Sequence, residues 1–133
     1  TPAAPGASEA CSLLSKQDAA AALGEAVTGP RSVAGASMPG TSACGYEGSG
    51  IHKVNLSVMH FPPDTAAMYK ALCAQKTKDG LTGLGDVACW YNEKHEELQV
   101  LKGGTFFSIE LRKSGNPTEA IIGVARKIYA QVK

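Results

Sequence analysis

Two matching tetrapeptides, each with a cysteine in second place, most constrain the fold of this chain. They are Ala43-Cys44-Gly45-Tyr46 and Ala88-Cys89-Trp90-Tyr91. A strand pattern and then a helix start follow each of them, so the order strand, strand, helix is predicted twice. The second copy is longer and has room for one additional strand. We expect two unequal halves related by a pseudo-twofold axis, over 11–78 and 79–133, with a coincidental match as the alternative.

The pairing of the cysteines follows from the same repeat. Four cysteines allow three connectivities, and their positions alone do not choose among them. The repeat favours pairing each helix-side cysteine with the strand cysteine that comes next, which gives Cys11 with Cys44 and Cys73 with Cys89. Structural zinc sites and redox pairs usually need closely spaced cysteines, and this chain has no such pair. We expect two disulfides, no metal and no cofactor.

Helix and strand signals alternate along the chain. Ser15 to Asp18 resemble a capping box, and apolar residues recur at three- and four-residue steps after Pro117. Gly103-Gly104 separate two strand patterns and suit a two-residue hairpin turn, because glycine adopts positive φ angles without steric cost. The predicted helices span 15–23, 64–75 and 117–131, and the clearest strands span 53–61, 97–102 and 105–113.

These elements predict one α+β domain over residues 11–133. We expect about six antiparallel strands in a curved sheet, with the three helices packed on one face. The net charge of +1 gives no field of a single sign that could hold a nucleic-acid backbone. No apolar run approaches the ~20 residues needed to cross a bilayer. We therefore expect a monomer without a nucleic-acid partner.

Residues 1–10 have the composition of a flexible tether. Small residues and two prolines dominate this segment, as they do after a removed export signal in bacterial envelope proteins. An even number of cysteines in a small chain independently favours an oxidising compartment. We expect an exported protein, periplasmic or held at the cell surface, and any lipid anchor would lie upstream of Thr1.

Three residues are candidates for a binding surface outside the histidines. Trp90 either anchors a partner from an exposed face or packs beneath helices, and its alternation with Cys89 does not decide which. Leu81 and Leu84 belong to the glycine-rich loop 79–86, which we expect to link the two halves. These leucines either pack on the core or line the edge of a cleft.

The three histidines have ordinary structural interpretations. His95 lies among glutamates, a pattern that suits a divalent cation but is also typical of a solvated hairpin tip. His52 is expected at a glycine-rich turn and His60 at the end of a strand. No serine or cysteine has a histidine neighbour that the sequence assigns, so no nucleophile is predicted.

Short motifs in the first half resemble a known type of protein. They are Ala10-Cys11-Ser12-Leu13-Leu14-Ser15, the stretch Ala21-Ala22-Leu23-Gly24-Glu25-Ala26-Val27, and Cys44-Gly45-Tyr46. This pattern, over residues 10–61, is similar to that of small exported bacterial envelope proteins, many of them lipoproteins of unknown function. The resemblance implies an α+β domain with helix-to-strand disulfides in the cell envelope. It carries over no catalytic residues.

The function expected from the sequence is binding. We expect a non-enzymatic exported domain that binds a protein or a small ligand through its open sheet face or the 79–86 loop. One alternative is a metal-dependent hydrolase that uses His95 with nearby glutamates. Another is a structural or inhibitory module that acts through the Gly103-Gly104 hairpin and the charged tip at 92–97.

Overall fold

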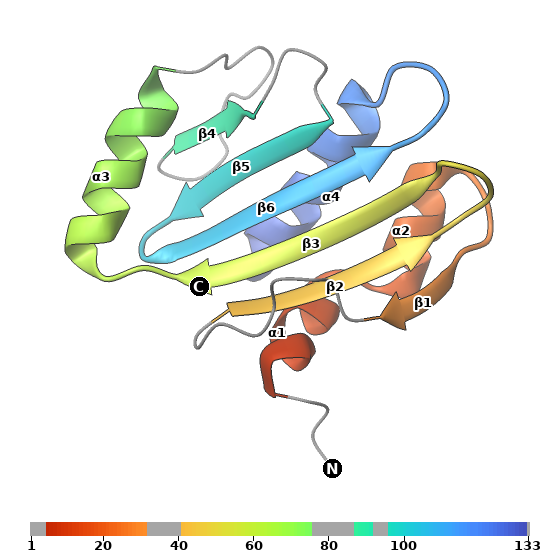
Figure 1. Cartoon of the computed structure of the whole chain (residues 1–133), viewed down its shortest axis with the longest axis horizontal. Helices are drawn as coiled ribbons and strands as arrows, with labels where there is room; N and C mark the ends of the chain where they lie inside the picture. The colour runs from red at the N-terminus through yellow and green to blue at the C-terminus, as the bar shows by residue number, and fades with distance from the viewer. Residues whose placement is uncertain (1–4, 32–40, 76–86, 92–95, 133) are drawn as a thin grey trace.

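The chain folds into a six-stranded antiparallel sheet with four helices (Figure 1). The computed structural model describes residues 5–31, 41–75, 87–91 and 96–132. Its helices are α1 (Pro5–Leu13), α2 (Lys16–Leu23), α3 (Pro63–Ala74) and α4 (Thr118–Gln131). Its strands are β1 (Thr28–Arg31), β2 (Thr41–Glu47), β3 (Lys53–His60), β4 (Val87–Trp90), β5 (Glu97–Lys102) and β6 (Thr105–Arg112). The predicted α+β class is confirmed.

The sheet consists of two three-stranded meanders that meet at its centre. The strand order is β1-β2-β3-β6-β5-β4, so β3 and β6 are neighbours and β1 and β4 lie at the edges. A twofold axis between β3 and β6 relates β1 to β4, β2 to β5 and β3 to β6. The predicted equivalence of Cys44 and Cys89 is therefore wrong, because β2 lies inside the sheet whereas β4 is an edge strand.

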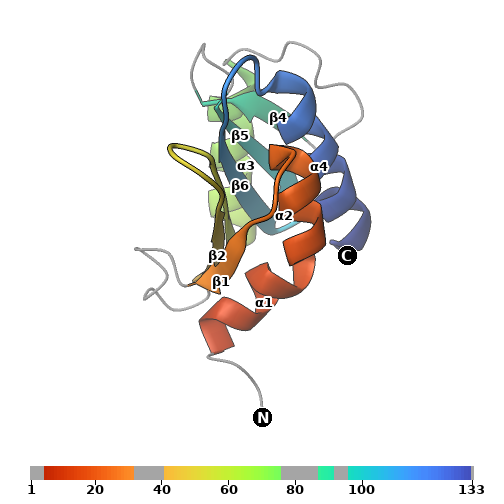
Figure 2. The same cartoon turned by 90° about the vertical axis from the view of Figure 1, so that its right-hand side faces the viewer.

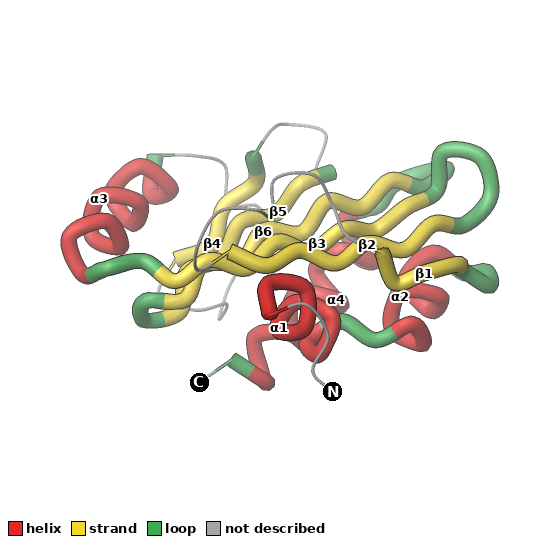
Figure 3. The backbone as a smooth tube through the Cα atoms, turned by 60° about the horizontal axis from the view of Figure 1, so that its bottom comes forward, coloured by secondary structure: helices red, strands yellow, loops and turns green. Residues whose placement is uncertain are grey.

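Three helices cover one face of the sheet, and α3 lies on the other. α1, α2 and α4 are together on one side, as the edge-on views show (Figures 2 and 3). Our assignment of residues 64–75 to that side is wrong. The α3 side chains of Tyr69 and Cys73 contact Phe106 and Cys89, which alternate with core residues and so point to the opposite face. The helices thus break the pseudo-twofold symmetry that the strands obey.

Alternation along the two central strands builds the main core. Val54, Leu56 and Val58 of β3 are fully buried, and they pair in register with residues 111, 109 and 107 of β6. These apolar side chains point toward α1, α2 and α4, as the period of two requires. The same period places Lys53, Asn55 and Ser57 on the opposite, polar face.

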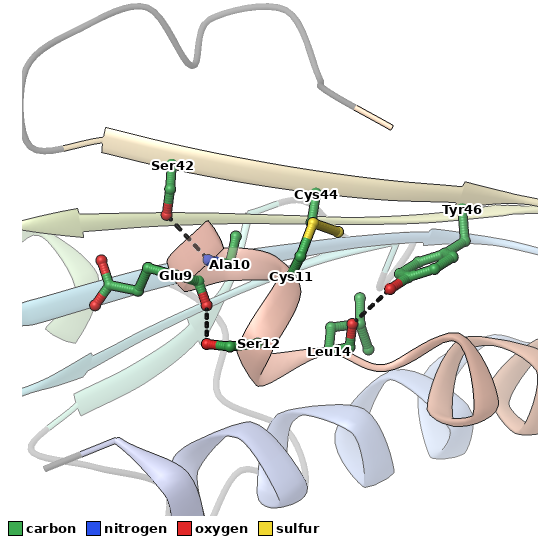
Figure 4. The surroundings of a disulfide bond; sticks show 8 residues. All are labelled: Glu9, Ala10, Cys11, Ser12, Leu14, Ser42, Cys44 and Tyr46. Carbon is green, nitrogen blue, oxygen red and sulfur yellow. Dashed lines mark hydrogen bonds between the residues drawn. A yellow bond between two sulfur atoms is a disulfide. The ribbon is translucent and has the colours of Figure 1, made fainter. Parts of the chain in front are cut away.

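α1 replaces much of the tether that we expected over residues 1–10. It begins at Pro5, and Ala10 is completely buried. Three alternating residues of β2 hold it (Figure 4): Ser42 Oγ accepts the Ala10 N–H at 3.2 Å, and the Tyr46 hydroxyl donates to the Leu14 carbonyl at 2.8 Å. Between them Cys44 is bonded to Cys11. The prediction failed because these contacts are non-local, whereas composition reports only local preference.

Both predicted disulfides are present. Cys11–Cys44 joins α1 to β2 with a Cα separation of 5.1 Å, and Cys73–Cys89 joins α3 to β4 with a Cα separation of 5.6 Å. The two bonds lie on opposite faces of the sheet, since Cys44 faces α1 and Cys89 faces α3. On the chain-entropy model, loops of these lengths stabilise the fold by about 4 and about 3 kcal/mol.

The predicted hairpin and helix caps are confirmed. Lys102 pairs with Thr105 across a two-residue turn in which Gly103 has a φ of 60°. The Lys102 ammonium donates to the carbonyls of Tyr129 and Val132 at the end of α4, where a positive charge favours the helix dipole. Ser15 caps α2, and none of the described helices is long and apolar enough to cross a membrane.

We predict that Tyr46→Phe lowers the free energy of unfolding by about 1–2 kcal/mol, because a buried carbonyl of Leu14 loses its donor. Urea unfolding monitored by circular dichroism measures the change. Tyr129→Phe is the matched control: it keeps the ring beneath the Lys102 ammonium and is expected to change stability by less than about 0.5 kcal/mol. Equal effects of the two substitutions would contradict the role given to the Tyr46 hydroxyl.

Candidate functional site

The candidate binding residues from the sequence do not form one site. Trp90 is 1% exposed and belongs to the main core, so packing accounts for it and the interpretation as a surface anchor is wrong. Leu81, Leu84 and His95 lie outside the described residues. Among the described residues, no three His, Cys, Asp or Glu side chains are grouped so that they could hold a metal ion.

The largest hollow along the described part of the chain is a groove between α2 and α4. We call it the α2–α4 groove, and its volume is about 420 Å³. This volume lies within the range of small-molecule sites in proteins. Its lining combines small residues with four charged ones: Ala21, Ala22, Ala120, Gly123 and Val124, with Asp18, Lys113, Glu119 and Lys127.

Charged groups of both signs border the α2–α4 groove. Lys127 Nζ lies 3.1 Å from the Asp18 carboxylate and spans the two helices. Burial opposes ionisation of Asp18, but hydrogen bonds from Lys127 and Ser15 outweigh it and hold its pKa below the usual value. Lys113 Nζ donates to the Ala22 carbonyl at 3.2 Å, at the C-terminal end of α2. A ligand in this groove would meet positive and negative groups together.

Gly123 gives the groove its depth. It lies in the middle of α4 and is exposed, and a Cβ atom added there would meet nothing within 4 Å. Glycine inside a helix costs about 1 kcal/mol relative to alanine. Since no neighbour in the described structure requires a glycine here, its visible effect is the open space above the helix surface.

A hydrogen-bonded cluster around His52 connects three loops at one end of the sheet. His52 lies in the turn between β2 and β3, and its Nδ1 is bonded to the Glu25 carboxylate. On the other side of the ring, Nε2 accepts the backbone N–H of Ser114 at 3.1 Å and lies 3.0 Å from the Ser114 hydroxyl. Glu25 also accepts from the backbone and hydroxyl of Ser49.

The order of groups in this cluster is that of a carboxylate, imidazole and hydroxyl triad. In a hydrolase, the Nε2 lone pair must be free to take the hydroxyl proton. Here that lone pair already accepts the N–H of Ser114 itself. The chemistry of the cluster is therefore that of a hydrogen-bonded connection among the α2–β1, β2–β3 and β6–α4 loops.

A second histidine makes a similar connection at the far end of β3. His60 Nε2 lies 2.8 and 2.9 Å from the two carboxylate oxygens of Glu9 on α1. Its Nδ1 lies 3.4 Å from the Thr105 hydroxyl. Both histidines had been given only ordinary roles from the sequence, because their glutamate partners are 27 and 51 residues away. Nothing local signals either pair.

The face that carries α3 has an aromatic cluster at one end. Phe61 stacks on Phe106 with ring centroids 5.2 Å apart, and Tyr69 meets Phe106 edge-on at 4.6 Å. The Tyr69 hydroxyl donates to Gln99. Burial, with a smaller effect of the Glu97 charge, raises the pKa of Tyr69 to about 12. These contacts hold α3 against the sheet and leave Met68 and Leu72 on its outer side exposed.

The fold and its sites define a disulfide-linked α+β domain with an inter-helix groove and two histidine–glutamate connections. Comparisons with known proteins add no name to this class. No protein-family model matches the chain, and neither a curated protein nor a solved structure is significantly similar to it.

We predict that Glu25→Gln flattens the acid limb of the stability profile. Hydrogen bonds from His52 and then Ser49 hold the pKa of Glu25 below its ordinary 4.5. A lowered pKa in the folded state adds stability above pH 4.5, and this stability is lost as the pH falls through the folded value. The substituted protein should therefore lose less stability than the wild type on acidification below pH 4.5.

Urea unfolding at a series of pH values below 7 measures this profile. Glu119→Gln removes one carboxylate outside the cluster and controls for the change in net charge. Identical acid limbs for wild type and Glu25→Gln would show that the cluster does not hold the Glu25 carboxylate ionised.

Proposed function

We propose that the protein is an exported, non-enzymatic binding domain and that the α2–α4 groove is its small-ligand site. Two disulfides in a small domain support the location, because such bonds persist in oxidising compartments. The placement in the periplasm or at the cell surface, with a possible upstream lipid anchor, is part of the same proposal.

The observation that carries the binding function is the exposed Gly123 in the middle of α4. It opens a groove of about 420 Å³ between two helices that are otherwise held by the Lys127–Asp18 ion pair. The groove offers a floor of small apolar side chains and charged groups of both signs at its border. These features suit a compact ligand with an apolar body and both an acidic and a basic group, such as a free amino acid or a short peptide.

A protein partner is the second candidate function. Met68 and Leu72 on α3 are 61% and 53% exposed and lie one helical turn apart, so they form a neighbouring apolar pair. Such pairs contribute to protein interfaces when further apolar surface surrounds them. Of the earlier alternatives, the hydrolase site at His95 and the 79–86 loop lie outside the described residues and stay predictions. The inhibitory module retains its Gly103-Gly104 hairpin.

We predict that Gly123→Leu abolishes binding in the α2–α4 groove, because its side chain would occupy the space above α4. Ligand-observed NMR against the common amino acids and a set of short peptides identifies a binder, and titration then gives its affinity. We expect at least a tenfold loss, about 1.4 kcal/mol. Gly123→Ala should raise helix stability by up to about 1 kcal/mol.

The matched control is Ala130→Leu, which adds the same side chain to an exposed position of α4 outside the groove. It should bind as the wild type does. A ligand that binds wild type and Gly123→Leu equally would remove the groove from consideration, and substitution of Met68 and Leu72 by serine would then test the α3 surface in pull-down experiments.

We predict that protein isolated from the periplasm carries no free thiol, whereas protein retained in the cytoplasm carries four alkylatable cysteines. Mass spectrometry after alkylation with and without reduction measures this difference. Unreduced, exported protein that takes up four alkyl groups would contradict the proposed location, since the two bonds would then not form where the protein works.

A further inference from the structure

The two histidines at the ends of β3 differ in what faces their second ring nitrogen. Each binds a glutamate of the N-terminal segment through one nitrogen. The other nitrogen of His52 faces the backbone N–H of Ser114 at 3.1 Å, whereas that of His60 faces the Thr105 hydroxyl at 3.4 Å. A backbone N–H only donates, but a hydroxyl either donates or accepts.

The partners of His52 define its protonation in this structure. The Glu25 carboxylate only accepts when ionised, so the proton of a neutral imidazole lies on Nδ1. Nε2 must then be unprotonated, because Ser114 presents its N–H to this atom. Hydrogen bonds from His52 and Ser49 lower the pKa of Glu25, which is consistent with an ionised carboxylate.

We propose that His52 is a proton-operated latch, in which protonation at Nε2 displaces the Ser114 N–H and releases the loop between β6 and α4. A proton taken from solvent onto Nε2 would place two donors against each other. The conflict ends when the loop shifts so that the Ser114 hydroxyl accepts from Nε2–H. The bond from Nδ1 to Glu25 persists in both states and becomes an ion pair in the protonated one.

Charged groups of both signs surround the ring. Glu25 from the α2–β1 loop and Glu47 at the end of β2 favour the imidazolium, whereas Lys53 on β3 and Arg112 on β6 oppose it. The His52 side chain is 20% exposed, so solvent protons reach it. Histidine ordinarily changes its charge between about pH 5 and 8, so this latch would operate in a range that an envelope protein meets.

The latch has a direct connection to the α2–α4 groove. Lys113 precedes Ser114 in the chain, donates to the Ala22 carbonyl and lines the groove. Movement of Ser114 therefore displaces a charged wall of that groove. This consequence for binding rests on the proposed function, whereas the latch itself does not.

Amide hydrogen exchange followed by NMR on the full chain tests the latch without any ligand. We expect the protection factor of the Ser114 amide to fall about tenfold between pH 8 and pH 5, as for the loss of one hydrogen bond. The Phe61 amide, which donates to the Gly104 carbonyl at 2.7 Å, reports global stability and should keep its protection factor. His52→Gln removes the titrating ring, so the pH dependence of Ser114 should disappear.

His60→Gln is the matched control, since it removes the other histidine–glutamate pair and should leave the response of Ser114 unchanged. Equal protection of Ser114 at both pH values in the wild type, or the same fall in His52→Gln, overturns the proposal. If His52→Gln does not fold, the ¹⁵N shift of His52 Nε2 in the wild type replaces it. Its titration midpoint must coincide with that of the Ser114 amide, and different midpoints overturn the proposal.

Affinity of the groove ligand at pH 5 and pH 8, in wild type and His52→Gln, then tests the consequence for binding. A pH-dependent affinity in the wild type alone supports the link through Lys113. If the groove binds nothing, the proposed function fails while the exchange results still decide the latch. The two failures are therefore distinguishable.

Discussion

The attachment of α1 to one row of β2 side chains is the interaction on which the layered structure depends. Ser42, Cys44 and Tyr46 alternate along the strand and each makes one bond to the helix: a hydrogen bond, a disulfide and a second hydrogen bond. Because one bond is covalent, the two neighbouring hydrogen bonds form at little further entropic cost. The helix thereby closes the end of a core that α2 and α4 cover elsewhere.

Local patterns in the sequence predicted the elements well. The alternation of residues in β3 and β6, the cap at Ser15 and the glycine turn at 103–104 each depend on neighbours within a few residues, and all are present. The face chosen by α3 depends instead on Cys89 and Phe106, which lie far along the chain. Sequence periodicity shows that a helix has an apolar side, but not which face of a sheet receives it.

The candidate sites were less accessible to sequence reasoning for the same physical reason. The α2–α4 groove joins Asp18 to Lys127, and the His52 cluster joins the α2–β1 loop to the β6–α4 loop. Neither has a motif, because its members are brought together by the sheet topology alone. The correct disulfide pairing came from a repeat whose strand equivalence is wrong, so its success rested on the order of cysteines and helices along the chain.

The Cys11–Cys44 bond also determines how the domain would carry mechanical load. A pull on the N-terminal side of Cys11 passes through the sulfur atoms directly into β2, and β2 is hydrogen-bonded to β3 along its length. The segment between the two cysteines, which includes α2 and β1, is bypassed by this covalent path. A chain held in this way would keep α2, one wall of its groove, free of tension while the sheet bears the force.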